Sequence, residues 1–257
     1  MEDYPIKVGS ALFTLVEPRR GHEVAYNRWY ERDHFYAGCM IGPGNFAGRR
    51  WVATRRHKDL RIAPPGNPVT GDVPDAGSYL AVYWVLAGMH DEWNRWGVDQ
   101  VNYLHANGRM FAERDHVHTV LYRTEWEVGP EDGVSLALAL DHPFNGLVAT
   151  LVECDDASAL ATWHRDTALA SAGVGVCAGF SPLPLLADAP GDVPRAEGGD
   201  NRRMVLWFLD RDPADGWAET FGSHADALAS SGAGRLLWAA PFIPTIPGTD
   251  TYTDQLW

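Results

Sequence analysis

Proton donors and acceptors gather on one side of an expected helix at residues 23–37. At 3.6 residues per turn, one stripe of this helix carries polar and aromatic side chains where Leu and Val would ordinarily face a core. Its most informative members are Tyr26, Trp29, Tyr30, Asp33 and His34. The unperturbed pKa of a histidine is about 6.5, so His34 suits a general base, with Asp33 or Tyr30 orienting it or donating a proton. A structural alternative is a histidine that ends a helix beside amphipathic tyrosines.

Further candidates for substrate contact come from other expected elements. Tyr26 and Trp29 on the first helix, Tyr83 on the third strand, His105 on the second helix and His118 on the fourth strand are the expected substrate-binding residues. His116 and His118 alternate on one strand, which places both on the same side. Two such histidines can ligate a metal, but no carboxylate stands at a helpful spacing, so no metal site is predicted.

Hydrophobic periodicity predicts the elements that must position these residues. The first half reads as strand, helix, strand, strand, helix, strand, expected at residues 7–16, 23–37, 46–54, 79–86, 91–113 and 116–125. The second half repeats this order at residues 147–154, 156–170, 174–183, 204–209, 213–230 and 235–242. Pro- and Gly-rich stretches at 63–77 and 190–201 are expected to be loops.

Aromatic landmarks support an internal duplication. Trp29 and Phe46 have the same separation as Trp163 and Phe180, and Trp84 and Trp93 have a counterpart in Trp207 and Trp217. We therefore divide the chain at 1–129, which carries the proposed site, and 130–257, which serves as scaffold. A βαββαβ unit has both helices on one face of its antiparallel sheet, and its other face needs a partner. The predicted fold class is α+β, with two ferredoxin-like repeats whose sheets face each other in a barrel-like pseudo-dimer.

A short motif in the first half resembles a known family. Trp29-Tyr30-Glu31-Arg32-Asp33-His34, followed by Pro43-Gly44 and then Arg49-Arg50, is similar to the EthD-type dimeric α/β-barrel pattern. The resemblance covers residues 7–125 well and the second half only in outline. It implies a site at His34 and Tyr30 beside the sheet. The broader superfamily includes cyclases, isomerases, monooxygenases and haem-dependent members, so the fold does not define the reaction.

The second half departs from this motif. With Trp163 aligned on Trp29, His34 corresponds to Ala168 and Tyr30 to His164. The acid–base pair is lost, and we expect one working site per chain.

Composition narrows the class of function. The chain has 257 residues, 46% of them hydrophobic and 21% charged, and a net charge of −13. This charge argues against nucleic acid and anionic membrane surfaces as partners. No signal peptide or membrane helix is visible, and Cys39, Cys154 and Cys177 form no recognisable disulfide or zinc pattern, so a cytoplasmic protein is expected.

These observations favour a cofactor-independent acid–base enzyme, a cyclase, isomerase or dehydratase. Its expected partner is a hydrophobic, aromatic or polyketide-like small molecule, and the chain is expected to be a monomer with an internal pseudo-dimer or a homodimer. One alternative is a haem- or metal-dependent oxidoreductase with His118, His105 or His34 as ligand. Another is a non-catalytic carrier of an apolar ligand. Dinucleotide, P-loop and serine-hydrolase motifs are absent from the sequence.

Overall fold

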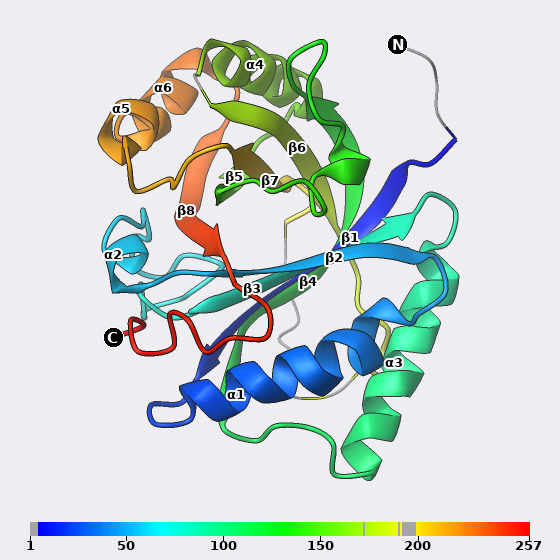
Figure 1. Cartoon of the computed structure of the whole chain (residues 1–257). Helices are drawn as coiled ribbons and strands as arrows, with labels where there is room; N and C mark the ends of the chain where they lie inside the picture. Colours follow the sequence, from blue (N-terminus) through cyan, green and yellow to red (C-terminus); the bar gives the residue numbers. More distant parts are fainter. Residues whose placement is uncertain (1–4, 172, 190, 192–198) are drawn as a thin grey trace.

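Eight strands rich in β-branched and aromatic residues close into one antiparallel barrel in the computed structural model, which describes residues 5–171, 173–189, 191 and 199–257 (Figure 1). The strands are β1 (Val8–Pro18), β2 (Asn45–Val52), β3 (Tyr79–Leu86), β4 (Arg114–Val128), β5 (Gly146–Glu153), β6 (Val174–Leu183), β7 (Arg202–Leu209) and β8 (Arg235–Pro244). The helices are α1 (Glu23–Trp29), the π-helices η1 (Tyr30–His34) and η2 (Tyr36–Met40), α2 (Arg55–Lys58), α3 (His90–Ala106), the 3₁₀-helix η3 (Leu136–Leu138), α4 (Ala157–Ala170), α5 (Trp217–Phe221) and α6 (His224–Ser231).

The strand order confirms the predicted pairing of two ferredoxin-like sheets. Each half has the same internal order, β4-β1-β3-β2 and β8-β5-β7-β6, and the last strand of each half pairs with the second strand of the other. The two seams differ in length. Strands β4 and β6 pair over seven residue positions, whereas β2 and β8 pair only through Trp51 with Pro244 and Val52 with Ile243. The boundary at 129/130 stays a prediction.

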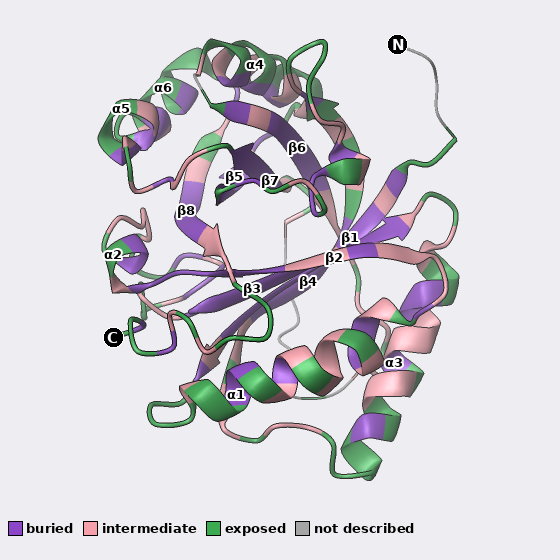
Figure 2. Ribbon diagram, in the orientation of Figure 1, coloured by how far each residue is buried: buried purple, intermediate pink, exposed green. Residues whose placement is uncertain are grey.

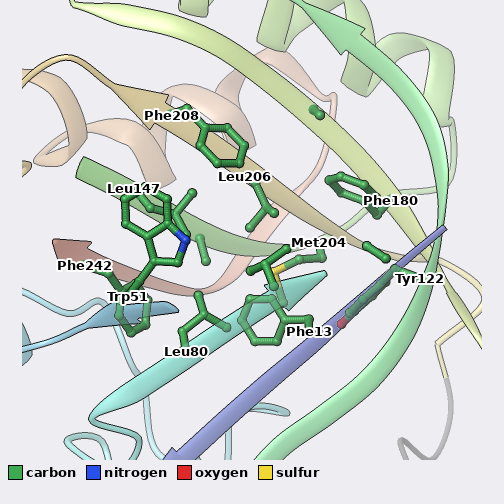
Figure 3. Packing of buried hydrophobic residues seen from close by; sticks show 14 of the residues in the cluster. Phe13, Trp51, Leu80, Tyr122, Leu147, Phe180, Met204, Leu206, Phe208 and Phe242 are labelled. Carbon is green, nitrogen blue, oxygen red and sulfur yellow. The ribbon is translucent and has the colours of Figure 1, made fainter. Parts of the chain in front are cut away.

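The helices lie outside the barrel and the apolar core lies inside it. Helices α1 and α3 cover the outer face of the first sheet, and α4, α5 and α6 cover that of the second (Figure 1). Along β3, Leu80, Val82 and Trp84 belong to the interior cluster, whereas Tyr79 and Tyr83 pack toward α1. Side chains from both halves fill the interior (Figure 3), and the strands are largely buried (Figure 2). Because the interior is packed, a site beside the first sheet must lie under its helices.

Several element boundaries differ from the sequence-based expectation. The helix expected at 91–113 ends at Ala106, where Gly108 adopts a left-handed φ of 65°. The helix expected at 213–230 is two short helices, α5 and α6. Most of the loop expected at 190–201 lies outside the described residues. Trp84 points into the barrel but Trp207 packs toward the helices, so these two tryptophans are not equivalent landmarks.

The C-terminal tail after β8 crosses back to the first half and lies along α1 (Figure 1). Leu256 is fully buried in the same cluster as Tyr26 and Tyr30. The Trp257 indole N–H donates to Glu23 Oε1 at 2.6 Å. The second half therefore helps to hold the helix that carries the expected site.

Candidate functional site

A cavity of about 110 Å³ lies between the outer face of β1 and β4 and the helices η1, η2 and α3. Its walls are mainly apolar, and they include Leu12, Trp93, Val98, Val101, Leu121 and Leu185. Its polar lining comes from Thr14, Tyr30, His34, Asn94, Arg114, His116 and Thr119, together with Cys39. We call this space the inner cavity. Of the predicted site residues, only His34 and Tyr30 line it.

A π-helical turn sets the direction of the His34 side chain. The Phe35 backbone N–H bonds to the carbonyl of Tyr30, the i→i+5 pattern of a π-helix, which is frequent at functional sites. The imidazole consequently stacks on the ring five residues earlier, Trp29, with centroids 4.6 Å apart, and meets Tyr30 edge-on at 5.3 Å. Gly38 makes room for it, because a Cβ at that position would lie 2.7 Å from His34 Cε1.

His34 is a neutral imidazole in the wall of the cavity. Burial lowers the pKa of His34 to about 3, and the positive charge of Arg114 contributes. Its Nδ1 is buried and has no hydrogen-bond partner among the described residues. This low pKa argues against the expectation that His34 exchanges protons near neutrality. What the site offers is an unprotonated lone pair beside apolar walls; the catalytic role of His34 stays a prediction.

Tyr30 belongs to a buried group of tyrosines. Its hydroxyl shares a 2.9 Å hydrogen bond with that of Tyr83, and burial raises the pKa of both well above the usual value for tyrosine. The Arg50 guanidinium lies over the ring of Tyr30 at 4.5 Å. Tyr26 packs behind Tyr30 at 5.7 Å, and burial raises its pKa to about 12. These phenols keep their protons at neutral pH and can donate hydrogen bonds. Tyr83 and Tyr26 support Tyr30 from outside the cavity lining.

Asp33 does not pair with the imidazole. Its carboxylate accepts two hydrogen bonds from the Arg109 guanidinium, one from Nε at 3.2 Å and one from Nη2. The carbonyl of Arg109 accepts the indole N–H of Trp29 at 2.8 Å. Asp33 and Trp29 thus fasten the loop after α3 to the helix, and neither lines the inner cavity.

The two strand histidines point to opposite sides of β4, which corrects the expectation that they share one. His116 and His118 pair with adjacent residues of β1, because the register between the two strands shifts here and β4 has one extra residue. The extra residue breaks the usual alternation of sides along β4. His118 turns into the packed barrel, 5.7 Å from the ring of Phe13 and 3.0 Å from the Tyr122 hydroxyl. His116 instead lines the inner cavity. A bulge depends on the partner strand, so alternation within β4 could not reveal it.

A second hollow, of about 580 Å³, adjoins the inner cavity at the protein surface. We call it the outer hollow. His105, exposed on α3, lines it together with Arg19, Phe111 and Asp115. Met110, Arg114 and His116 line both spaces. Arg114 could not be singled out from the sequence, because nothing local distinguishes an arginine at the start of a strand.

A string of hydrogen bonds runs along the sheet from the junction of the two spaces into the inner cavity. Arg114 Nη2 lies 3.2 Å from His116 Nε2, and an arginine can only donate, so this nitrogen accepts. His116 Nδ1 then carries the proton and donates to Thr119 Oγ1 at 3.0 Å. The Thr119 hydroxyl shares a 3.0 Å bond with that of Thr14. The orientation of His116 is thereby set.

The equivalent region of the second half, under α4, is packed with large aromatic side chains and histidines. His164, the counterpart of Tyr30, is fully buried against Trp126 and Trp207, each with a ring centroid 5.3 Å away. Its Nδ1 donates to the carbonyl of Leu160 at 2.9 Å. Large aromatic side chains occupy the space under α4, and the scaffold role of this half stays a prediction.

Comparisons with known proteins identify the fold. No family model matches the chain, and no curated protein does. Among solved structures, a putative monooxygenase from Fusobacterium nucleatum is 8% identical with a TM-score of 0.52, covering 93% of this chain and 94% of that one. An anthrone oxidase-like protein is 8% identical with a TM-score of 0.55, covering 96% and 98%. A DypB variant from Rhodococcus jostii in complex with haem is 9% identical with a TM-score of 0.50, covering 97% and 94%.

These likenesses confirm the ferredoxin-like dimeric α/β-barrel fold, here built within one chain. The neighbours carry oxygenase, oxidase or haem-related names rather than those of cyclases, isomerases or lyases.

Across the described ranges, no helix is long and apolar enough to cross a membrane. The same residues contain no group of three or more His, Cys, Asp or Glu side chains placed to hold a metal ion.

Proposed function

We propose that this protein is an oxidoreductase that binds a hydroxylated aromatic molecule with one ring in the inner cavity. Apolar walls suit the ring, and His34 and Tyr30 can accept and donate hydrogen bonds to hydroxyl groups. The volume of about 110 Å³ lies below the 300–1,000 Å³ typical of drug-sized ligands. It is closer to the cavity of about 150 Å³ that holds benzene in an engineered protein. A single ring is therefore the preferred occupant.

The observation that carries this proposal is the neutral His34 imidazole in the cavity wall, whose Nδ1 has no hydrogen-bond partner within the described part of the chain. A general base works best when its pKa lies near the working pH. With a pKa of about 3, His34 is a poor base for removing a proton from carbon, the step that cyclisation or isomerisation requires. A phenolic hydroxyl becomes strongly acidic as it loses an electron, so a weak base is then sufficient. The site favours oxidation over the lyase or isomerase chemistry expected from sequence.

The simplest balanced reaction is the oxidation of a quinol by dioxygen. The quinol loses two electrons and two protons and becomes a quinone, and dioxygen takes them up as hydrogen peroxide. His34 accepts a hydroxyl proton as the ring is oxidised. Tyr30, hydrogen-bonded to Tyr83, provides a neutral donor near the same ring.

Haem is the alternative cofactor, and the inner cavity does not fit it. A neutral histidine with a free nitrogen is the right donor for iron, and of the three predicted ligands only His34 offers one at a cavity. His118 is enclosed by the barrel core, and His105 is exposed on α3. The volume of about 110 Å³ cannot enclose a porphyrin, so a haem bound through His34 would have to extend into the adjoining outer hollow. Adding haemin and recording the visible spectrum tests this directly, and we expect no His34-dependent band.

Oxygen consumption with single-ring quinols and catechols tests the proposal. We expect turnover in the wild type and a loss of about 10²–10⁴-fold in His34→Ala, with a smaller loss in Tyr30→Phe. His22→Ala is the matched control, because His22 is exposed at the start of α1. Turnover of His34→Ala within about threefold of the wild type refutes the role of His34. A bound quinol recovered unchanged, without oxygen uptake, indicates the carrier function instead.

A further inference from the structure

The inner cavity and the outer hollow meet at three side chains with different chemistry. Met110, Arg114 and His116 line both spaces. A substituent on a ring bound in the inner cavity would therefore pass these three side chains on its way to the surface. No aspartate or glutamate lines the inner cavity among the described residues. A group attached to that ring therefore meets Arg114 before it meets any carboxylate of the lining.

Arg114 is held in place at this junction. Its Nη1 donates to the carbonyl of Phe111, its Nη2 lies 3.2 Å from His116 Nε2, and its guanidinium carbon lies 5.3 Å from the centre of the Trp29 ring. An arginine with a fixed plane is well suited to a carboxylate, which it can bind through two parallel hydrogen bonds.

The surrounding charges favour an anion, although the chain as a whole is acidic. Arg114 brings a positive charge to the junction, and Arg19 and Asp115 also line the outer hollow, while the net charge of the chain is −13. Arg19 is paired with Asp115 at 3.3 Å and with Glu113, which lies outside the lining, at 3.2 Å. Arg19 is therefore balanced by its two acidic partners, and the positive charge that a group on the ring meets at the junction is that of Arg114.

We propose that the natural substrate carries a negatively charged group, such as a carboxylate, on a short arm from its ring, and that Arg114 binds this group. This inference rests on the proposed function, because it assumes that the ring occupies the inner cavity. It assigns a substrate class, hydroxylated aromatic acids, and a specificity-determining residue.

Three probes with the same hydroxylated ring and different arms test it by calorimetric titration: 4-hydroxyphenylacetate is anionic, p-cresol neutral and tyramine cationic. We expect the anion to bind about tenfold or more tighter than p-cresol, and tyramine to bind weakest. This preference should shrink in about 1 M salt, where the Debye length is about 3 Å. Because the probes are compared by binding, no turnover is needed.

Variants of Arg114 assign the preference to that side chain. Arg114→Gln should lower the affinity for 4-hydroxyphenylacetate about tenfold or more and that for p-cresol by less than about threefold. Arg114→Lys keeps the charge and should restore part of the preference. Arg123→Gln is the matched control, because Arg123 is exposed on the same strand and lines neither space. Circular dichroism checks that each variant folds, and the salt series on the wild type tests the charge preference without any variant.

The outcomes separate the two proposals. Equal affinities for the three probes, or an anion preference unchanged in Arg114→Gln, overturn this inference and leave the proposed function standing. No binding of any probe overturns both.

Discussion

The substitution Gly38→Ala should disable the site through His34 alone. A Cβ at position 38 would lie 2.7 Å from His34 Cε1 and 2.8 Å from Nδ1. Ordinary contact begins at about 3.4 Å, so the imidazole must move by about 0.7 Å. Stacking on Trp29 at 4.6 Å and the edge contact with Tyr30 leave little space for that movement.

The expected cost is large for turnover and small for stability. A misplacement of about 1 Å can lower a rate about 10²-fold, so we expect quinol oxidation to fall about tenfold to a hundredfold. Replacing a helical glycine by alanine adds about 1 kcal/mol of helix stability, which partly offsets an overpacking cost of about 1–3 kcal/mol. Oxygen uptake and thermal melts on the same preparation measure both quantities.

Gly97→Ala provides the comparison for this variant. Gly97 also lines the inner cavity, on α3, but a Cβ there has no heavy atom within 4 Å. The added methyl group should stabilise α3 by about 1 kcal/mol and leave kcat within about threefold, with any effect confined to KM. Equal kcat in Gly38→Ala and the wild type would refute the argument that the position of the imidazole controls turnover.

Three further predictions concern stability. Burial lowers the pKa of His34 and His164 to about 3 and that of His118 to about 4, so these groups stay neutral in the folded state but protonate near pH 6.5 when unfolded. Their contribution is therefore intact above about pH 6.5 and is lost as the pH falls toward 4, and melts from pH 7.5 to 5 should show a falling Tm. His164→Ala should lower the free energy of unfolding by about 1–3 kcal/mol without changing ligand affinity, whereas His34→Ala should lower ligand affinity with little loss of stability. An equal loss of binding in both variants would contradict a single site per chain. Leu256→Ala should cost about 2–4 kcal/mol in urea denaturation, whereas Ile246→Ala, at 47% exposure, should change stability by less than about 0.5 kcal/mol.

Features of the fold that depend on the local sequence pattern could be predicted. The order of the elements and the closure of two sheets into one barrel follow from hydrophobic periodicity, and the structure confirms them. The helix stripe also led to the two residues, Tyr30 and His34, that line the inner cavity.

Features that depend on long-range contacts could not be predicted. The bulge that separates His116 from His118 arises from pairing with β1, and alternation along one strand cannot detect it. The π-helical turn at η1 has no sequence signal in a segment that suits an ordinary helix. The low pKa of His34 comes from burial under Trp29 and from Arg114, a residue far along the chain. Two residues of the candidate cavity could thus be predicted from the sequence, and their chemical environment could not.

Joining two barrel halves in one chain changes what a mutation can do. In a symmetric dimer each substitution occurs in both subunits, so filling one site with tryptophan would fill the other as well. Here Trp126 and Trp207 pack the second half while Tyr30 and His34 remain in the first. The two seams between the halves also differ in length: β4 and β6 pair at seven positions, and β2 and β8 pair at two. Fusion therefore allows one half to change toward tight packing while the other keeps the polar side chains of the candidate site.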